Sequence, residues 1–200
     1  MIAPMGGETR VARASGRERV LEAAYELFSR GGVSTTGVDT VIAEAGVAKM
    51  TLYRNFGSKE ELALAFLDLR EQRWTYGWVA REVAQRADTP AGMLLAIFDV
   101  FGGWFARDDF EGCSFISVMG ELHGQESAVG DAAKRHLANI RTILAGLAAE
   151  AGIDEPDSFA HQWQLLMKGS IVAAMEGDRE AGRRAREMGE LLLRAHGVDV

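Results

Sequence analysis

The sequence predicts an all-α fold, and three observations lead to that prediction. Only 3 of the 200 residues are proline, so few positions force a helix to end. Apolar residues recur at helical spacing in successive stretches, which glycine-rich or aspartate-containing breaks separate. No stretch alternates apolar and polar residues for long enough to suggest a strand. We therefore expect a chain of about nine helices.

The chain begins with an arm and a first helix. Residues 1–14 lack apolar periodicity and are expected to form a flexible arm. Ser15 and Glu18 have the spacing of a capping box, which predicts the start of the helix. Gly31 and Gly32 predict its end.

The next two helices are short and follow each other closely. Thr36 stands where it would cap a helix over residues 38–45, and Gly46 would end that helix. A third helix is expected over residues 49–55.

A long helix and five further helices complete the predicted fold. Ser58 and Glu61 repeat the capping-box spacing and open a helix that runs toward Ala87. Gly102 and Gly103 interrupt the next apolar stretch and predict a kink beside a cavity. The remaining helices are expected over residues 91–107, 113–123, 127–151, 157–176 and 179–195.

Charge is distributed unevenly along the chain. The net charge is -7, but residues 1–59 carry eight basic and six acidic side chains, a net +2. Residues 60–200 carry 14 basic and 23 acidic side chains, a net -9. This asymmetry is typical of a polyanion-binding module joined to a body that the polyanion avoids.

The composition excludes several classes of protein. Cys113 is the one cysteine, so no intrachain disulfide forms, and the four histidines lack the spacing of a metal site. We expect a buried, unreactive thiol, no bound metal and no cofactor. No apolar run is long enough to span a membrane, and no signal peptide is recognisable, so we expect a cytoplasmic protein. No nucleophile elbow, P-loop or dinucleotide fingerprint occurs, so we expect no enzyme and assign no catalytic residue.

The helix pair over residues 38–55 has the pattern of a helix-turn-helix. Its tight turn is Ala45-Gly46-Val47. Leu52 and Phe56 lie four residues apart and are placed to anchor the inner face of the second helix. The polar residues between them would then face outward, where a major groove of DNA can be read.

Three stretches of this region resemble the TetR (tetracycline-repressor) family of bacterial transcriptional regulators. They read R-E-R-V-L-E-A-A-Y-E-L-F from Arg17, then V-I-A-E-A-G-V, then T-L-Y-R-N-F-G-S-K-E-E-L, and the resemblance runs to Leu69. It implies an N-terminal three-helix DNA-binding domain over residues 15–59. It also implies a helical effector-binding and dimerisation domain over residues 60–200.

The resemblance implies two sets of DNA-binding side chains. The first set would specify the DNA sequence, because arginine pairs with guanine edges and asparagine with adenine edges. It consists of Lys49, Arg54 and Asn55. The set that would position the protein on phosphates is Thr51, Tyr53 and Lys59. Thr40 and Met50 would also lie near bases or phosphates. Met50 and Asn55 depart from the residues common in the family, which bears on the operator sequence.

The aromatic residues of the body have two interpretations. Core packing is the default, whereas family members hold a ligand cavity among these helices, which would suit a small apolar or aromatic effector. The candidate ligand-binding residues are Trp74, Trp78, Phe101, Trp104, Phe105, Phe115, Trp163 and Met167.

The last two helices offer apolar faces that one chain does not fully cover. Family members pair these helices across a twofold axis into a four-helix bundle. The candidate dimer-interface residues are Leu165, Ile171, Val172, Met188 and Leu192.

The sequence therefore predicts a homodimeric, ligand-responsive transcriptional regulator. Its partners would be a palindromic double-stranded DNA operator and a small effector that releases the protein, acting as a repressor, from that operator. The alternative is a helical small-molecule-binding protein or enzyme whose N-terminal domain no longer binds DNA. The weak net charge of +2 on residues 1–59 leaves this alternative open.

Overall fold

The computed structural model describes residues 14–199 and consists of helices and their connections within that range. Residues 1–13 of the predicted arm lie outside the described residues. α4 (Lys59–Arg70), the π-helical segment η1 (Glu71–Val79) and α5 (Ala80–Ala84) follow one another without a break. With these three counted as one, the described residues contain nine helices, which confirms the predicted all-α fold. None of these helices is long and apolar enough to cross a membrane.

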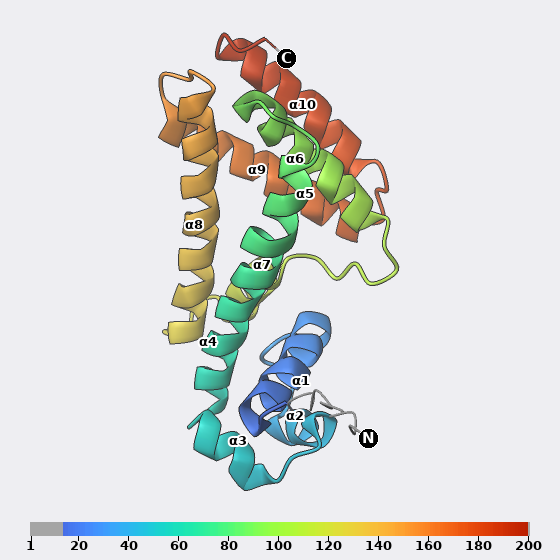
Figure 1. The fold of residues 1–200 in the computed structure, drawn as a ribbon, viewed down its shortest axis with the longest axis vertical. Helices are drawn as coiled ribbons and strands as arrows, with labels where there is room; N and C mark the ends of the chain where they lie inside the picture. The colour runs from blue at the N-terminus through green and yellow to red at the C-terminus, as the bar shows by residue number, and fades with distance from the viewer. Residues whose placement is uncertain (1–13, 200) are drawn as a thin grey trace, which may run out of the picture.

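The N-terminal helices gather at one end of the molecule. α1 (Gly16–Gly31), α2 (Val38–Ala45) and α3 (Lys49–Asn55) pack on one another, and α1 also contacts α4 (Figure 1). α1 opens with the predicted capping box: the Ser15 hydroxyl accepts the Glu18 N–H at 3.2 Å, and the Glu18 carboxylate accepts the Ser15 N–H at 2.7 Å.

The predicted cap of α2 is wrong by one residue. Gly37 occupies the N-cap position and provides no side-chain hydrogen bond. The hydroxyl of Thr36 instead donates to the carbonyl oxygen of Gly32 at 2.7 Å. Thr36 is buried in the turn between α1 and α2, so its side chain closes that turn rather than the helix.

One hydrophobic core lies under these helices and extends beyond them. It joins α1–α4 to α7 (Ser114–Glu121) and to the first half of α8 (Ala128–Glu150). Phe66 of α4 lies in it, with its ring centroid 5.5 Å from that of Phe28 and 5.8 Å from that of Tyr25. The long helix from Lys59 therefore contributes to the same core as the helix-turn-helix.

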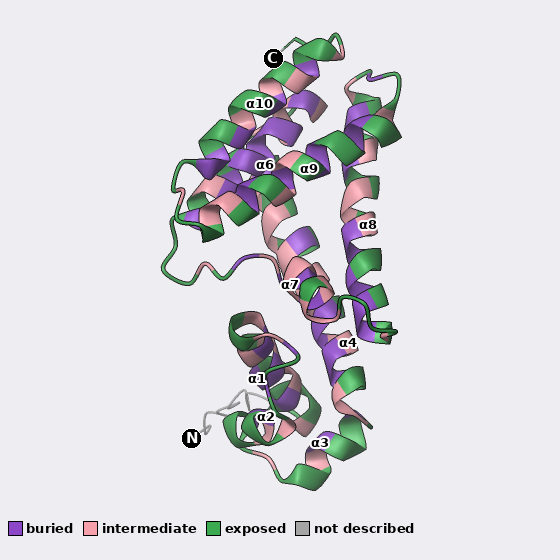
Figure 2. Cartoon of the chain, turned by 180° about the vertical axis from the view of Figure 1, so that it is seen from behind, coloured by how far each residue is buried: buried purple, intermediate pink, exposed green. Residues whose placement is uncertain are grey.

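A second hydrophobic core fills the other end of the molecule. It is formed by α6 (Pro90–Phe105), the second half of α8, α9 (Pro156–Met175) and α10 (Ala181–Ala195). Buried residues line the faces that α6, α9 and α10 turn toward one another (Figure 2). The long helix α4–η1–α5 runs from the first core to the second (Figure 1).

Gly102 of α6 has a packing role. α6 remains helical through Gly102 and Gly103, where the sequence predicts a kink. A Cβ atom built on Gly182 of α10 would lie 2.8 Å from Cα of Gly102, so the two helices cross in close backbone contact. Neither Gly102 nor Gly103 lines a cavity described below.

Candidate functional site

α2 and α3 form a helix-turn-helix. Gly46 follows α2 with φ 59° and ψ 41°, a left-handed conformation that glycine adopts without strain. Its carbonyl oxygen accepts a hydrogen bond from the Arg19 guanidinium of α1 at 3.2 Å. Leu52 and Phe56 are buried, as the spacing predicts, and anchor the inner face of α3 against the first core.

The opposite face of α3 is exposed to solvent. Met50 is 61% exposed and Tyr53 40% exposed, although both are large hydrophobic residues. Arg54 is exposed, and its side chain forms no ion pair or hydrogen bond with residues 14–199. The amide nitrogen of Asn55 donates to the carbonyl oxygen of Thr51 at 2.7 Å, which leaves its amide oxygen as a free acceptor.

The two lysines of the predicted interface are held at its edges. Lys49 Nζ lies 3.2 Å from Oδ1 of Asp39 on α2, and this hydrogen bond raises the pKa of Lys49. Lys59 Nζ donates to the carbonyl oxygen of Ser34 at 3.3 Å. Thr40 is exposed on α2.

Thr51 has a structural contact that the sequence does not indicate. A Cβ built on Gly16 would lie 2.6 Å from its Cγ2 methyl group. The half-buried Thr51 therefore packs α3 against the start of α1, in addition to any contact with a phosphate.

Beyond the helix-turn-helix, the long helix borders two cavities. The first, of about 210 Å³, lies between η1, α5, α6, α8 and α9 and is lined almost entirely by apolar side chains. Thr75 is the exception, because its side chain is polar. Its buried hydroxyl has no hydrogen-bond partner among the described residues. The lining residues are Trp74, Thr75, Val79, Ala80, Val83, Ala84, Met93, Ile97, Ile140, Ile143, Leu144, Leu147 and Met167.

The second cavity, of about 300 Å³, is polar and lies between α1, the long helix and the loop that joins α6 to α7. Its charged residues come from both ends of the molecule: Glu26 and Arg30 from α1, Arg70 and Arg73 from the long helix, and Arg107, Asp109 and Glu111 from the loop.

The predicted ligand-binding residues divide between these cavities and the core. Trp74 borders both cavities, Met167 the apolar one, and Trp78 and Trp104 the polar one. The other four line neither cavity. Phe101 and Phe105 pack around Trp104, Phe115 stacks on His136 in the first core, and Trp163 lies between Phe98 and Phe159.

Comparison with known proteins identifies the family. Residues 20–66 match the model of the bacterial regulatory proteins, tetR family. A solved structure from Streptomyces avermitilis, assigned as a TetR transcriptional regulator, is 30% identical with a TM-score of 0.81, and the match covers 92% of this chain and 100% of that one. The chain belongs to the TetR family.

Two further relatives support this assignment. SCO4454, a TetR-family regulator from Streptomyces coelicolor, is 25% identical with a TM-score of 0.79, over 90% of this chain and 95% of that one. The transcriptional activator FasR of Mycolicibacterium smegmatis is 42% identical over 67 residues. That match spans 32% of this chain and only 31% of FasR. The protein is thus a TetR-family transcriptional regulator with a DNA-binding helix-turn-helix.

In this TetR-family chain, α9 and α10 carry an exposed apolar face. Leu165 is 69% and Leu191 63% exposed, and Val172, Met175 and Met188 are exposed as well. Of the predicted interface residues, Ile171 is buried within its own chain and Leu192 is half-buried. Most of the exposed large hydrophobic residues of the described chain therefore lie on these two helices.

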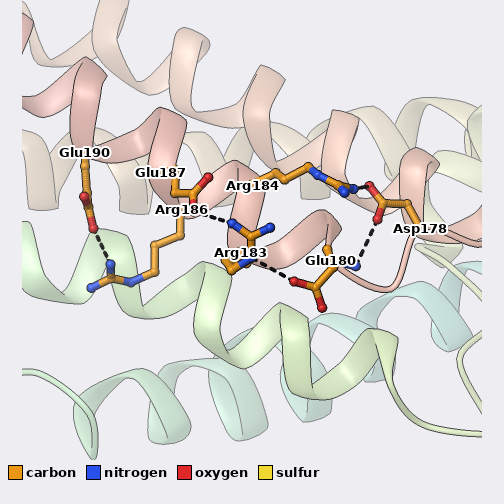
Figure 3. Close-up of polar contacts among 7 residues, drawn as sticks. All are labelled: Asp178, Glu180, Arg183, Arg184, Arg186, Glu187 and Glu190. Carbon is orange, nitrogen blue, oxygen red and sulfur yellow. Dashed lines mark hydrogen bonds and ion pairs between the residues drawn. The ribbon is translucent and has the colours of Figure 1, made fainter.

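The charged side chains of α10 form ion pairs with one another, with the preceding turn and, through Arg186, with Asp99 of α6 at 3.2 Å. Arg183 bonds Glu180 at 2.8 Å and also Glu187, while Arg184 bonds Asp178 and Arg186 bonds Glu190 (Figure 3). Because each of these arginines has a carboxylate on its own helix or the preceding turn, the charges of α10 are balanced locally. Its exposed leucine and methionine residues are left without a partner in the described chain.

Three residues of the site were not predicted from the sequence. Thr75 and Arg70 face the cavities, but a hydroxyl or guanidinium within a helical stretch gives no signal of the cavity beside it. Met175 adds to the apolar face, and its position three residues after Val172 was the available signal. Cys113 is half-buried rather than buried as predicted, and desolvation raises the pKa of its thiol. Its lack of reactivity stays a prediction.

Proposed function

We propose that the protein is a homodimeric repressor that binds a palindromic operator and is released by a small apolar or aromatic effector. The observation that carries the proposal is the unbroken helix α4–η1–α5. Its first turn follows directly on the helix-turn-helix, and its later turns line the apolar cavity. A displacement at the cavity would therefore move the segment that holds the DNA-reading helix.

Contacts between α1 and the long helix support this coupling. Arg73 of η1 binds Glu22 of α1 with two hydrogen bonds, at 2.7 and 2.9 Å. Arg70 donates to the hydroxyl of Tyr25 at 3.0 Å. Rotation or bending of η1 would thus be transmitted to α1 as well as to α3.

The π-helical form of η1 is itself consistent with a movable segment. π-Helical turns are rare, and they occur frequently at functional sites. Trp74 and Thr75 lie in this segment and face the cavity. An apolar ligand with one polar group would bury its surface there and give the Thr75 hydroxyl a partner.

Dimerisation would follow from the apolar face of α9 and α10. The two DNA-binding domains of one dimer would read half-sites about 34–36 Å apart, in successive major grooves. An effector that binds better to a dimer whose DNA-binding domains are spaced differently would lower operator affinity by linkage. A switch from 99% bound to 99% free requires about 5.5 kcal/mol of differential binding.

The experiment pairs DNA binding with a blocked cavity. Operator DNA obtained by selection from random duplexes is titrated with the wild type and with Val79→Phe, which enlarges a half-buried side chain of the cavity wall and would fill the apolar cavity. We expect both proteins to bind the operator, and only the wild type to be released by active members of a panel of apolar and aromatic compounds. The control is Ala149→Phe on the exposed side of α8, which should respond like the wild type.

Two results would contradict the proposal. One is equal release of the wild type and Val79→Phe by the same compounds, which would place the effector elsewhere. The other is a rise in transcription from an operator-linked reporter when the protein is expressed, which would make it an activator.

A further inference from the structure

The polar cavity between α1 and the α6–α7 loop has features of a binding site in its own right. Its volume of about 300 Å³ is at the lower end of the range for small-molecule sites, about 300–1,000 Å³. It lies on the α1 side of the long helix, where the loop over residues 106–113 passes α1 (Figure 1). Its occupant would touch the DNA-binding end and the body at once.

Most charges that line this cavity are already paired. Arg107 binds Asp109 through two hydrogen bonds of 2.7 Å. Arg73 binds Glu22 in the same bidentate way. Arg30 lies 3.3 Å from Glu26, and it lies 3.5 Å from the carboxylate of a loop residue, Glu111. These pairs hold the walls of the cavity in place.

Arg70 is the arginine of the cavity that has no ion pair within residues 14–199. Its guanidinium donates to the Tyr25 hydroxyl at 3.0 Å, and it lies 5.6 Å from the centre of the Tyr25 ring and 5.7 Å from that of Trp74. An arginine has five N–H donors, so most of them are left for a ligand. Arg30 lies near two carboxylates, Glu26 and Glu111, so Arg70 is left without one.

Two further features indicate the shape of the ligand. The rings of Trp74, Trp78 and Trp104 line one side of the cavity, which favours a flat, conjugated body. The hydroxyl of Ser29, on α1, is buried at the cavity wall and has no hydrogen-bond partner among the described residues. A ligand oxygen would satisfy this hydroxyl.

We propose that this cavity binds a small aromatic monocarboxylate. The carboxylate accepts hydrogen bonds from Arg70 and Ser29, and the aromatic ring packs on the tryptophan rings. One negative charge would pair with Arg70, which has no ion pair within residues 14–199, and a planar carboxylate matches the geometry of a guanidinium. This site goes beyond the proposed function, because it is separate from the apolar cavity and its occupant has a charge.

The test is a titration of the DNA-free, full-length protein with sodium benzoate, followed by NMR of the indole N–H groups. Three of the four tryptophans border the polar cavity, while Trp163 lies in the second core and serves as an internal reference. Benzamide supplies the ring without the charge, and acetate supplies the charge without the ring. We expect saturable shifts of the Trp74, Trp78 and Trp104 signals with benzoate, and about tenfold weaker binding or more with either analogue.

Variants separate the proposed contacts from general effects. Arg70→Gln should weaken benzoate binding by about tenfold or more, and Ser29→Ala should weaken it without touching any charge. Arg81→Gln on α5 removes an exposed arginine away from the cavity and should bind like the wild type. Ser29→Ala also keeps the test decisive if Arg70→Gln fails to fold.

Equal affinity for benzoate and benzamide, an unchanged affinity in Ser29→Ala and Arg70→Gln, or shifts confined to Trp163 would each overturn the proposal. Because the titration uses no DNA, its failure would leave the proposed repressor function intact. Failure of operator binding would likewise leave this site untouched.

Discussion

Arg73 of η1 holds Glu22 of α1 through two parallel hydrogen bonds, from Nη1 to Oε1 at 2.9 Å and from Nη2 to Oε2 at 2.7 Å. Side chains 51 positions apart in the sequence thereby fasten the first helix to the middle of the long helix. The planar guanidinium fixes both the distance and the orientation of the carboxylate. This pair is a direct polar link between the DNA-binding end and η1, which borders both cavities.

The Glu22–Arg73 pair should show a pH-dependent coupling energy. Hydrogen bonding to Arg73 lowers the pKa of Glu22, so the pair stabilises the fold above the ordinary glutamate pKa and loses that contribution as pH falls through the lowered value. Both side chains are about half exposed, so we expect a coupling of about 0.5–1 kcal/mol at neutral pH. The measurement is a double-mutant cycle of Glu22→Gln and Arg73→Gln by urea unfolding, from about pH 7 to about pH 3.

A coupling energy that stays constant, or grows, as the solution is acidified would contradict this account of the pair. The cycle isolates the pair from the other carboxylates, since their titration affects all four proteins alike.

The crossing of α6 and α10 should not tolerate a methyl group. A Cβ on Gly182 would lie 2.8 Å from N and Cα of Gly102 and 2.9 Å from the carbonyl oxygen of Phe98, all backbone atoms that cannot rotate away. We expect Gly182→Ala to lower the free energy of unfolding by about 1–3 kcal/mol. Gly146→Ala in α8 is the matched control, because nothing lies within 4 Å of its Cβ. It should stabilise the protein by about 0.5–1 kcal/mol. Similar effects of both substitutions in thermal unfolding would refute the close crossing.

The apolar face of α9 and α10 should hold the dimer together. Leu165→Glu and Leu191→Glu place a charge where each leucine is mostly exposed in one chain. We expect each to weaken the dimer by about 2 kcal/mol or more, since an unpaired charge would be buried at the interface. Sedimentation velocity over a range of protein concentrations measures this effect. Tyr76→Glu replaces a half-exposed aromatic residue of η1 and should leave the dimer unchanged. If Leu165→Glu, Leu191→Glu and Tyr76→Glu all had the same association state, this face would not be the interface.

Lys59 should contribute to DNA affinity without regard to sequence. Lys59 is the first residue of α4, where the backbone N–H groups of a helix start would also bind a DNA phosphate. We expect Lys59→Ala to weaken binding to operator and random DNA alike, and to reduce the slope of log K against log salt by about 1. The slope is measured by fluorescence anisotropy at several salt concentrations, with Arg81→Ala as the control. A loss restricted to the operator would assign Lys59 to base recognition instead.

Local sequence signals predicted the helix-turn-helix correctly. The bounds of α2 and α3 agree with the predicted ranges, because Gly46 marks the turn and Leu52 with Phe56 sets the buried face. The capping box at Ser15 was equally clear. Thr36 was misjudged because a threonine before a helix serves a turn as readily as a cap.

The parts that sequence could not supply depend on long-range packing. Nothing in the stretch 71–79 distinguishes a π-helix from an α-helix, since both place apolar residues on one face. Aromatic composition likewise does not tell which rings border a cavity: Phe115 and Trp163 turn out to be core residues, whereas Trp74 lies between the two cavities. Gly102 marks a helix crossing whose partner, Gly182, lies 80 positions away.

Selection of operator DNA from random duplexes tests the central claim most directly, with the wild type and an Arg54→Ala, Tyr53→Ala double variant in parallel. The account predicts that the wild type enriches a twofold-symmetric sequence and binds it with steep salt dependence. The double variant, which keeps the buried Leu52 and Phe56, should fold normally and lose most of that affinity. Enrichment of no symmetric sequence, or equal binding of that sequence by both proteins, would contradict the assignment of α3 as the reading helix.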